Sequence, residues 1–146
     1  MSISGSCACQ SVKFELLPPL RDVITCHCKQ CRKMTGHFWA ATAVAKQNLK
    51  FLKEEGLTWF QSSKGVRRGF CKICGSNLFY DREGRDFVAV SPGAIDAEID
   101  LKTTEHIFVD EKGTYYDLSD ALPQSGGWSK TWAETDAKDF RSGDRS

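Results

Sequence analysis

Seven cysteines carry the chemistry that this sequence offers most clearly. They fall into three groups: Cys7-Ala-Cys9, Cys26-His-Cys28-Lys-Gln-Cys31 and Cys71-Lys-Ile-Cys74. Zinc prefers thiolate ligands in a tetrahedron, and a C-x-x-C turn lets two sulfurs converge on one ion. Gly75 follows the last pair directly and suits the tight turn of a zinc knuckle, which needs an unusual backbone angle. The sequence therefore predicts metal binding.

The cysteine count predicts one closed and one open site. Two pairs would complete a four-cysteine structural site, whereas three thiolates would leave one coordination position vacant, as in catalytic zinc sites. Spacing alone does not decide which group pairs with which. The simplest partition gives a structural zinc to the outer pairs and a second, functional zinc to the middle group: Cys7, Cys9, Cys71 and Cys74 for the first, and Cys26, Cys28 and Cys31 for the second. A thioredoxin-like redox pair and a single zinc with three idle thiols are the competing interpretations.

Histidines lie close to the middle group. On extended backbone, His27 would point away from an ion held by its two cysteine neighbours, so we interpret it as a supporting residue. His37 could close the second site as a fourth ligand if the backbone turned back. His106 is interpreted as structural.

Composition limits the class of protein. The net charge of +1 argues against a polyanion-binding protein, and 40% hydrophobic residues argue against disorder. The N-terminal residues lack the basic and apolar regions of a signal peptide, and no apolar run is long enough to cross a bilayer. Cysteines in a reducing compartment bind metals or react as thiols more often than they form disulfides. We therefore expect a soluble cytoplasmic protein.

The elements that must position the cysteines are short strands. Alternating apolar residues, with glycine and proline between the runs, indicate a mainly β fold. The expected strands cover residues 11–17, 23–28, 38–44, 57–61, 69–70, 77–80, 87–91 and 106–109. Short helices are expected near residues 29–35 and 129–140, the second with Trp128 and Trp132 on one face. Residues 1–124 would form the zinc-binding domain, and residues 125–146 a polar extension with a short docking helix.

Several segments resemble, in order, those of the glutathione-dependent formaldehyde-activating enzyme family, which includes centromere protein V. They are Gly5-Ser-Cys-Ala-Cys9, Cys26-His-Cys-Lys-Gln-Cys-Arg-Lys33, Ser63-Lys-Gly-Val-Arg-Arg-Gly-Phe-Cys71, Cys74-Gly-Ser76 and His106-Ile-Phe108. The resemblance runs from about Gly5 to Pro123. It implies a β-tent of small antiparallel sheets pinned by zinc, with the same partition of the cysteines. Gln10, where the family often has glycine, and Tyr115-Tyr116, where tryptophan is common, depart from the pattern.

The resemblance also implies an activity, that of a carbon–sulfur lyase related to S-(hydroxymethyl)glutathione synthase. Zinc that already has three thiolate ligands is a poor Lewis acid, so it is better suited to holding a fourth, nucleophilic sulfur than to activating water. Glutathione would be the cosubstrate and a glutathione–aldehyde adduct the product. Arg67 and Arg68, in the segment before the third cysteine group, are the candidates to bind a substrate carboxylate.

Two other functions remain open from the sequence. Because thiols add to formaldehyde without help, the chain could be a carrier for glutathione or a thiol adduct, without turnover. It could also be a zinc-stabilised interaction module, although the weak net charge and the lack of a basic tail argue against nucleic acid as a partner.

Overall fold

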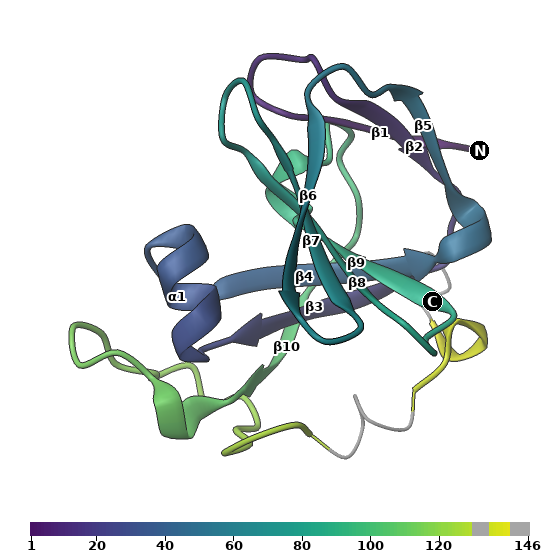
Figure 1. Ribbon diagram of the computed structural model, residues 1–146. Coiled ribbons are helices and arrows are strands. Elements are labelled where there is room, and N and C mark those ends of the chain that lie inside the picture. Colours follow the sequence, from purple (N-terminus) through teal and green to yellow (C-terminus); the bar gives the residue numbers. More distant parts are fainter. Residues whose placement is uncertain (130–134, 141–146) are drawn as a thin grey trace.

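The computed structural model describes residues 1–129 and 135–140, and its strands form two sheets (Figure 1). The smaller sheet has the order β1 (Ile3–Ser6), β2 (Lys13–Leu16), β5 (Leu49–Lys53). The larger sheet has seven strands, in the order β10 (Thr103–Ile107), β3 (Leu20–Cys26), β4 (Trp39–Ala45), β9 (Phe87–Val90), β8 (Asn77–Arg82), β7 (Val66–Cys71), β6 (Leu57–Ser63). One α-helix, α1 (Lys29–Thr35), and four 3-10 turns complete the described residues: Lys46–Asn48, Pro92–Ala94, Val109–Glu111 and Ala137–Asp139.

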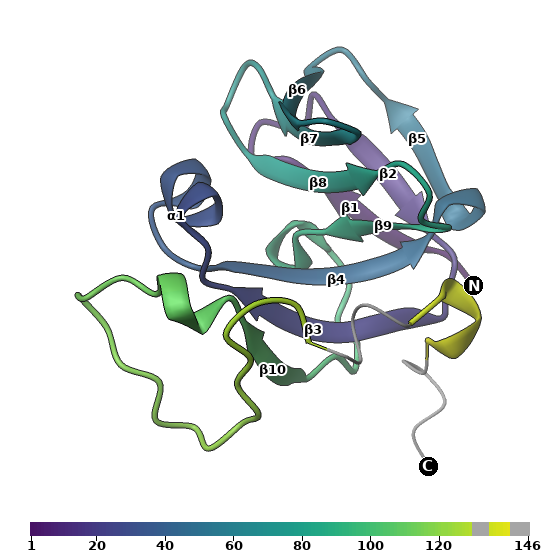
Figure 2. The same cartoon turned by 60° about the horizontal axis from the view of Figure 1, so that its bottom comes forward.

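The main core lies between the two sheets. In β2, Phe14 and Leu16 are fully buried, whereas Lys13, the first residue of the strand, is exposed, as the alternation of the sequence predicts. The ring of Phe14 meets that of Phe79 from β8 edge-on, with centroids 5.1 Å apart. Figure 2 shows the end of the larger sheet that carries β6 and β7 next to the smaller sheet. Burial of these apolar faces holds the two sheets together.

The prediction of a mainly β fold is confirmed, with two differences in detail. Most of the larger sheet is antiparallel, but β10 pairs with β3 in parallel, because the chain crosses the molecule between these two strands. Strand β1 was not expected, since its sequence Ile-Ser-Gly-Ser is mostly small and polar; it is held by pairing with β2.

Of the C-terminal helix expected over residues 129–140, residues 130–134, with Trp132, lie outside the described residues. Beyond them the structure has the 3-10 turn Ala137–Asp139 and Phe140, which is buried against Phe87. The division of the chain at residue 124 stays a prediction. No helix in the described part of the chain is long and apolar enough to cross a membrane.

The elements around α1 position the middle cysteines. Strand β3 ends at Cys26, α1 begins at Lys29, and β4 starts at Trp39. Figure 1 shows α1 at one end of the larger sheet, with the segment that follows β10 beside it. Two separate parts of the chain, residues 20–45 and the segment that follows β10, therefore meet at this end of the sheet.

Candidate metal centres

The outer cysteine pairs come together at the ends of two strands. Cys7 and Cys9 follow β1, and Cys71 is the last residue of β7. The sulfur of Cys9 lies 3.7 Å from that of Cys7 and 3.7 Å from that of Cys71. With Cys74, all four sulfurs lie within 4.8 Å of one another, so they could hold one metal ion. Cys7 and Cys71 are buried, which places this group at the edge of the main core.

Two tight turns shape this group. The amides of Val12 and Cys74 point at the sulfurs of Cys7 and Cys71, with distances of 3.3 Å and 3.4 Å. Gly75 has a φ of 80°, the unusual angle expected after the last pair, and its amide donates to the carbonyl of Cys71. Gln10 has a φ of 64°, a conformation that costs little for glycine but is strained for glutamine. The turn after the first pair therefore needs a left-handed residue at position 10.

The middle group converges at the start of α1. The sulfurs of Cys26, Cys28 and Cys31 also lie within 4.8 Å of one another. Cys28 is the N-cap of α1, and its sulfur accepts a hydrogen bond from the amide of Cys31 at 3.3 Å. Strand, cap and first helical turn each supply one sulfur. No fourth cysteine, histidine or carboxylate of the described residues joins this group, and His37 instead packs its ring against Phe38 and Tyr116.

The chemistry of both groups fits zinc. Hydrogen bonds with Cys26 and Cys31 lower the pKa of Cys28 to about 2, while the bonds with Cys28 and Cys31 and burial raise the pKa of Cys26. Three thiolates so close together would repel one another unless a cation replaced their protons. Sets of three or four thiolates select zinc among the common divalent ions, with closed sites structural and three-ligand sites open.

Strand register separates the two predicted arginines. On β7, Arg68 lies opposite Tyr80 of β8, which lies opposite Ala89 of β9. Directly opposite residues share a face, so these three side chains point to the side of the sheet that carries the middle cysteines. Successive residues of a strand point to opposite faces. Arg67 therefore lies on the other face, where it pairs with Asp81 at 2.9 Å and covers the ring of Trp59.

Arg68 is the charged group beside the middle cysteines. It is only 2% exposed, and its Nη2 donates to Gln30 Oε1 at 3.0 Å and to the sulfur of Cys31 at 3.4 Å. Its guanidinium carbon lies 5.1 Å from the centre of the Tyr80 ring. Its Nε and Nη1 are buried without a hydrogen-bond partner among the described residues. A buried cation with unused donors is costly, which favours an anionic or oxygen-bearing ligand at this point.

A pocket of ≈ 230 Å³ joins the middle cysteines to Arg68. The sheet supplies one side, including Trp39 and Tyr80, and the segment after β10 supplies another, including Phe108 and Trp128. Trp39 is buried and lines the pocket, and its indole N–H donates to Ser91 at 2.9 Å. The pocket therefore has a cluster of sulfurs, one partly unsatisfied guanidinium and aromatic walls.

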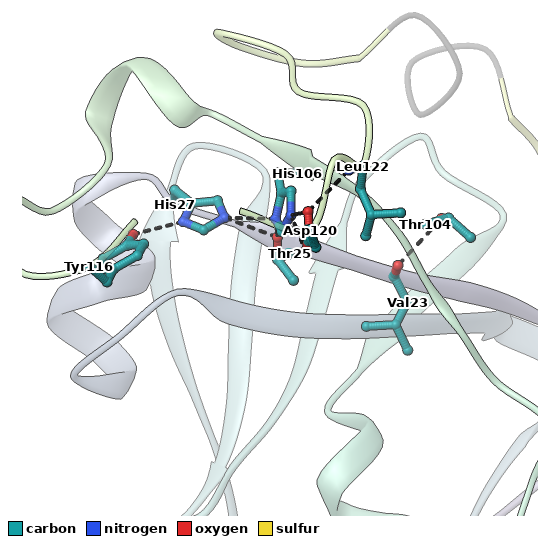
Figure 3. A network of polar contacts seen from close by, with 8 residues as sticks. All are labelled: Val23, Thr25, His27, Thr104, His106, Tyr116, Asp120 and Leu122. Carbon is teal, nitrogen blue, oxygen red and sulfur yellow. Dashed lines mark hydrogen bonds and ion pairs between the residues drawn. The ribbon is translucent and has the colours of Figure 1, made fainter. Parts of the chain in front are cut away.

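A chain of hydrogen bonds runs through His27, which lies between two of the middle cysteines, and is buried at Thr25, His27 and His106 (Figure 3). Tyr116 meets His27 Nδ1 at 2.7 Å, and His27 Nε2 meets Thr25 Oγ1 at 2.9 Å. Thr25 also bonds to His106 Nδ1, and His106 Nε2 lies 2.9 Å from the Asp120 carboxylate. One pattern that satisfies these contacts has each donor, from Tyr116 onward, giving its hydrogen to the next group: Tyr116 to His27, His27 to Thr25, Thr25 to His106 and His106 to Asp120.

The charge state of His27 agrees with this pattern. Burial and the neighbouring His106 lower the pKa of His27 to about 4, so its ring is neutral at neutral pH. The bond from the Leu122 amide lowers the pKa of Asp120, which stays an acceptor. His27 thus points away from the sulfurs, as predicted, and its bonds fix the backbone between Cys26 and Cys28.

The hydroxyl of Thr25 bonds to both imidazoles, so its removal should reduce the stability of the fold. We expect Thr25→Val to lower the free energy of unfolding by about 2 kcal/mol, because buried ring nitrogens lose their hydroxyl partner. Thr42→Val is the matched control, since the hydroxyl of this equally buried threonine makes one bond, to the carbonyl of Arg21. Its expected cost is about 1 kcal/mol. Urea unfolding measures both, and equal losses would contradict the central role of Thr25.

Some residues around the site could not be singled out from the sequence. Tyr80 is brought to the pocket by pairing with Arg68 across two strands, and Asp120 reaches His106 from an irregular segment. Gln30 lies within the middle cysteine motif, and this position was the only available signal of its role.

Comparisons with known proteins agree with the fold and the cysteine groups. The model of the glutathione-dependent formaldehyde-activating enzyme family matches residues 2–111. A Schizosaccharomyces pombe protein named an uncharacterized lyase is 22% identical over 117 residues, 79% of this chain and 84% of that protein. A crystal structure of a Rhodobacter sphaeroides protein shares the fold with a TM-score of 0.56 and 22% identity, covering 69% of this chain and 99% of the other. Because the family match spans most of the chain and includes all three cysteine groups, this protein belongs to the glutathione-dependent formaldehyde-activating enzyme family.

Proposed function

We propose that this protein is a carbon–sulfur lyase that interconverts glutathione and a small aldehyde with their S-hydroxyalkyl adduct. The observation that carries the proposal is the convergence of three sulfurs beside a buried arginine with unused donors, at one end of a pocket. Family membership supports the choice of thiol and aldehyde. The lyase name of the yeast relative supports the reaction type.

The cysteines have two separate roles in this proposal. Cys7, Cys9, Cys71 and Cys74 would hold a structural zinc that ties β1 to the end of β7. Cys26, Cys28 and Cys31 would hold the second zinc. When bound there, the metal would supply a vacant position for one further thiolate and keep that sulfur in its charged form.

Arg68 would stabilise the oxygen of the adduct. In the addition, the thiolate forms a bond to the carbonyl carbon, the carbonyl electron pair moves to oxygen, and the oxygen takes a proton. In the reverse reaction the hydroxyl loses its proton, the carbon–sulfur bond breaks, and sulfur leaves with the electron pair. Negative charge gathers on oxygen in both directions, and fixed buried donors stabilise such charge strongly.

This role differs from the carboxylate binding predicted for the two arginines. Arg68 is buried, and its Nη2 lies 3.4 Å from the sulfur of Cys31, so it is close to the atoms that react. The carboxylates of glutathione lie several bonds from its sulfur. Arg67 faces the other side of the sheet and has no part in the proposal.

The test is the exchange rate between free glutathione, aldehyde and adduct, followed by NMR in the presence of the zinc-loaded protein. We expect a saturable acceleration of about tenfold or more over the spontaneous rate. Cys28→Ser should abolish it, because the second metal loses a ligand. Serine is a good N-cap, so α1 should keep its start in this variant.

Two results would contradict the lyase. Tight binding of glutathione with no acceleration would identify a carrier instead. Acceleration that survives Cys28→Ser with the second zinc absent would place the reaction elsewhere on the molecule.

A further inference from the structure

The pocket beside the middle cysteines is larger than a one-carbon aldehyde requires. Its volume is ≈ 230 Å³, whereas a water molecule takes about 30 Å³ of liquid. The hydroxymethyl group that formaldehyde adds to a thiol has only two non-hydrogen atoms. Most of the pocket would remain empty beside such a group, so the space fits something larger.

The walls of this space are mostly apolar, and the polar side chains that line it are Arg21, Gln30, Ser63 and Arg68, beside the three cysteines. Strands β3, β4 and β9 contribute Ile24, Ala41 and Ala89. Phe108 and Trp128 close the other side, with their rings edge to face and their centroids 4.7 Å apart. The two alanines are buried, and their small side chains leave room that larger residues would fill. Apolar and aromatic walls favour an apolar occupant.

The ammonium group of glutathione does not fit this space. The tripeptide carries an ammonium group and two carboxylates. No aspartate or glutamate is among the described residues that line the pocket, so a buried ammonium would have no ion-pair partner there. The guanidinium of Arg68 lies beside the sulfurs, with its Nη2 3.4 Å from the sulfur of Cys31. The ammonium end of glutathione therefore stays outside, and the apolar part of the space, between the alanines and the two aromatic rings, remains for the aldehyde.

We propose that the aldehyde half of the substrate is an apolar aldehyde of several carbons, aliphatic or aromatic, rather than formaldehyde alone. This inference rests on the lyase function proposed above. Ala41 and Ala89 are then the residues that determine specificity, because they set the depth of the pocket. Each methylene that enters such a pocket should tighten binding about fourfold until the space is full.

Thioether analogues test the pocket without turnover, since their carbon–sulfur bond does not break. S-methylglutathione, S-butylglutathione and S-benzylglutathione are titrated into the zinc-loaded protein by calorimetry. We expect the butyl compound to bind roughly 60-fold more tightly than the methyl compound, from three added methylenes. The benzyl compound should gain by a similar factor.

Two variants locate the effect. Ala89→Leu should remove the gain of the larger groups, because the added side chain occupies the space that they need. Ala97→Leu is the matched control: Ala97 is exposed and does not line the pocket, so the gain should persist. Ala41→Leu fills the same space from β4 and serves if the first variant does not fold.

The outcomes separate this inference from the lyase proposal. Equal binding of the three compounds would overturn the inference, whether or not formaldehyde adduct exchange is accelerated. The inference would also be overturned if Ala97→Leu and Ala89→Leu reduced the tighter binding of the butyl and benzyl compounds to the same extent. A graded gain, reversed only by Ala89→Leu, together with no acceleration of any aldehyde, would retain the apolar pocket and refute the lyase.

Discussion

Replacing Cys71 with serine is expected to destabilise the whole fold. Cys71 is 0% exposed, belongs to the main core, and supplies one of the four sulfurs of the closed group. Loss of a structural metal is among the few single changes that cost about 5 kcal/mol or more. For a chain of this length that cost lowers the thermal midpoint by roughly 10–20 °C.

The physical reason lies in what this group connects. Cys7 follows the first strand of the small sheet, and Cys71 ends a strand of the large one. A metal held by both would fix the relative position of the sheets at the edge of their shared core. Without it, the apolar contact between the sheets alone must offset the entropy of ordering these turns.

Cys28→Ser is the matched control for this prediction. Cys28→Ser removes a sulfur from the open group, whose three cysteines are close together in the chain and join no distant segments. Serine can also cap α1 in place of Cys28. We expect the midpoint to fall by only a few degrees, about 1 kcal/mol in unfolding free energy. Metal analysis should find two zinc ions in the wild type and one in each variant. A midpoint within a few degrees of the wild type for Cys71→Ser would show that the closed group is not structural.

Arg68→Gln is expected to reduce kcat/KM for adduct breakdown by about 100-fold, measured with the second zinc saturated. Glutamine keeps a polar side chain but loses the charge and most of the N–H donors of this pocket-lining residue. Negative charge on the reacting oxygen would then be buried without compensation, and removing a buried charged partner of this kind costs several kcal/mol.

Arg67→Gln provides a neighbouring control on the same strand. Arg67 and its partner Asp81 both lie on the face of the sheet that is turned away from the pocket. Because the arginine is exposed, the pair stabilises the fold by less than about 1 kcal/mol. We expect kcat/KM to change by no more than about twofold, since Arg67 does not line the pocket with the cysteines. Equal losses in the two variants would show that the charge of the strand, rather than the position of Arg68, supports the reaction.

Much of the metal chemistry could be predicted because it depends on local geometry. A C-x-x-C turn brings its sulfurs together whatever the rest of the chain does, and Gly75 takes the positive φ that such a turn needs. The strands of the core could also be predicted from alternation, as at Phe14 and Leu16. Placing the two outer cysteine pairs in one group was the simplest partition of the seven cysteines. In the folded chain, the pairing of the strands brings these distant pairs together.

The roles of the two arginines could not be separated in the same way. Arg67 and Arg68 are adjacent and chemically identical in the sequence, and the register of β7 against β8 places one over Trp59 and the other beside Cys31. Register depends on all the strands of a sheet at once, and a shift by one residue would exchange the two side chains.

The sequence by itself therefore determined the kind of atoms that could bind metal, the short C-x-C and C-x-x-C pairs and the mainly β fold, because these follow from short-range spacing and period; the union of the distant pairs depends on the pairing of strands. Only the tertiary structure decided which arginine is buried, what lines the pocket and how large it is. Those features arise where β7, β8, β9, α1 and the segment after β10 meet, and no local pattern encodes the distances between segments so far apart in the chain.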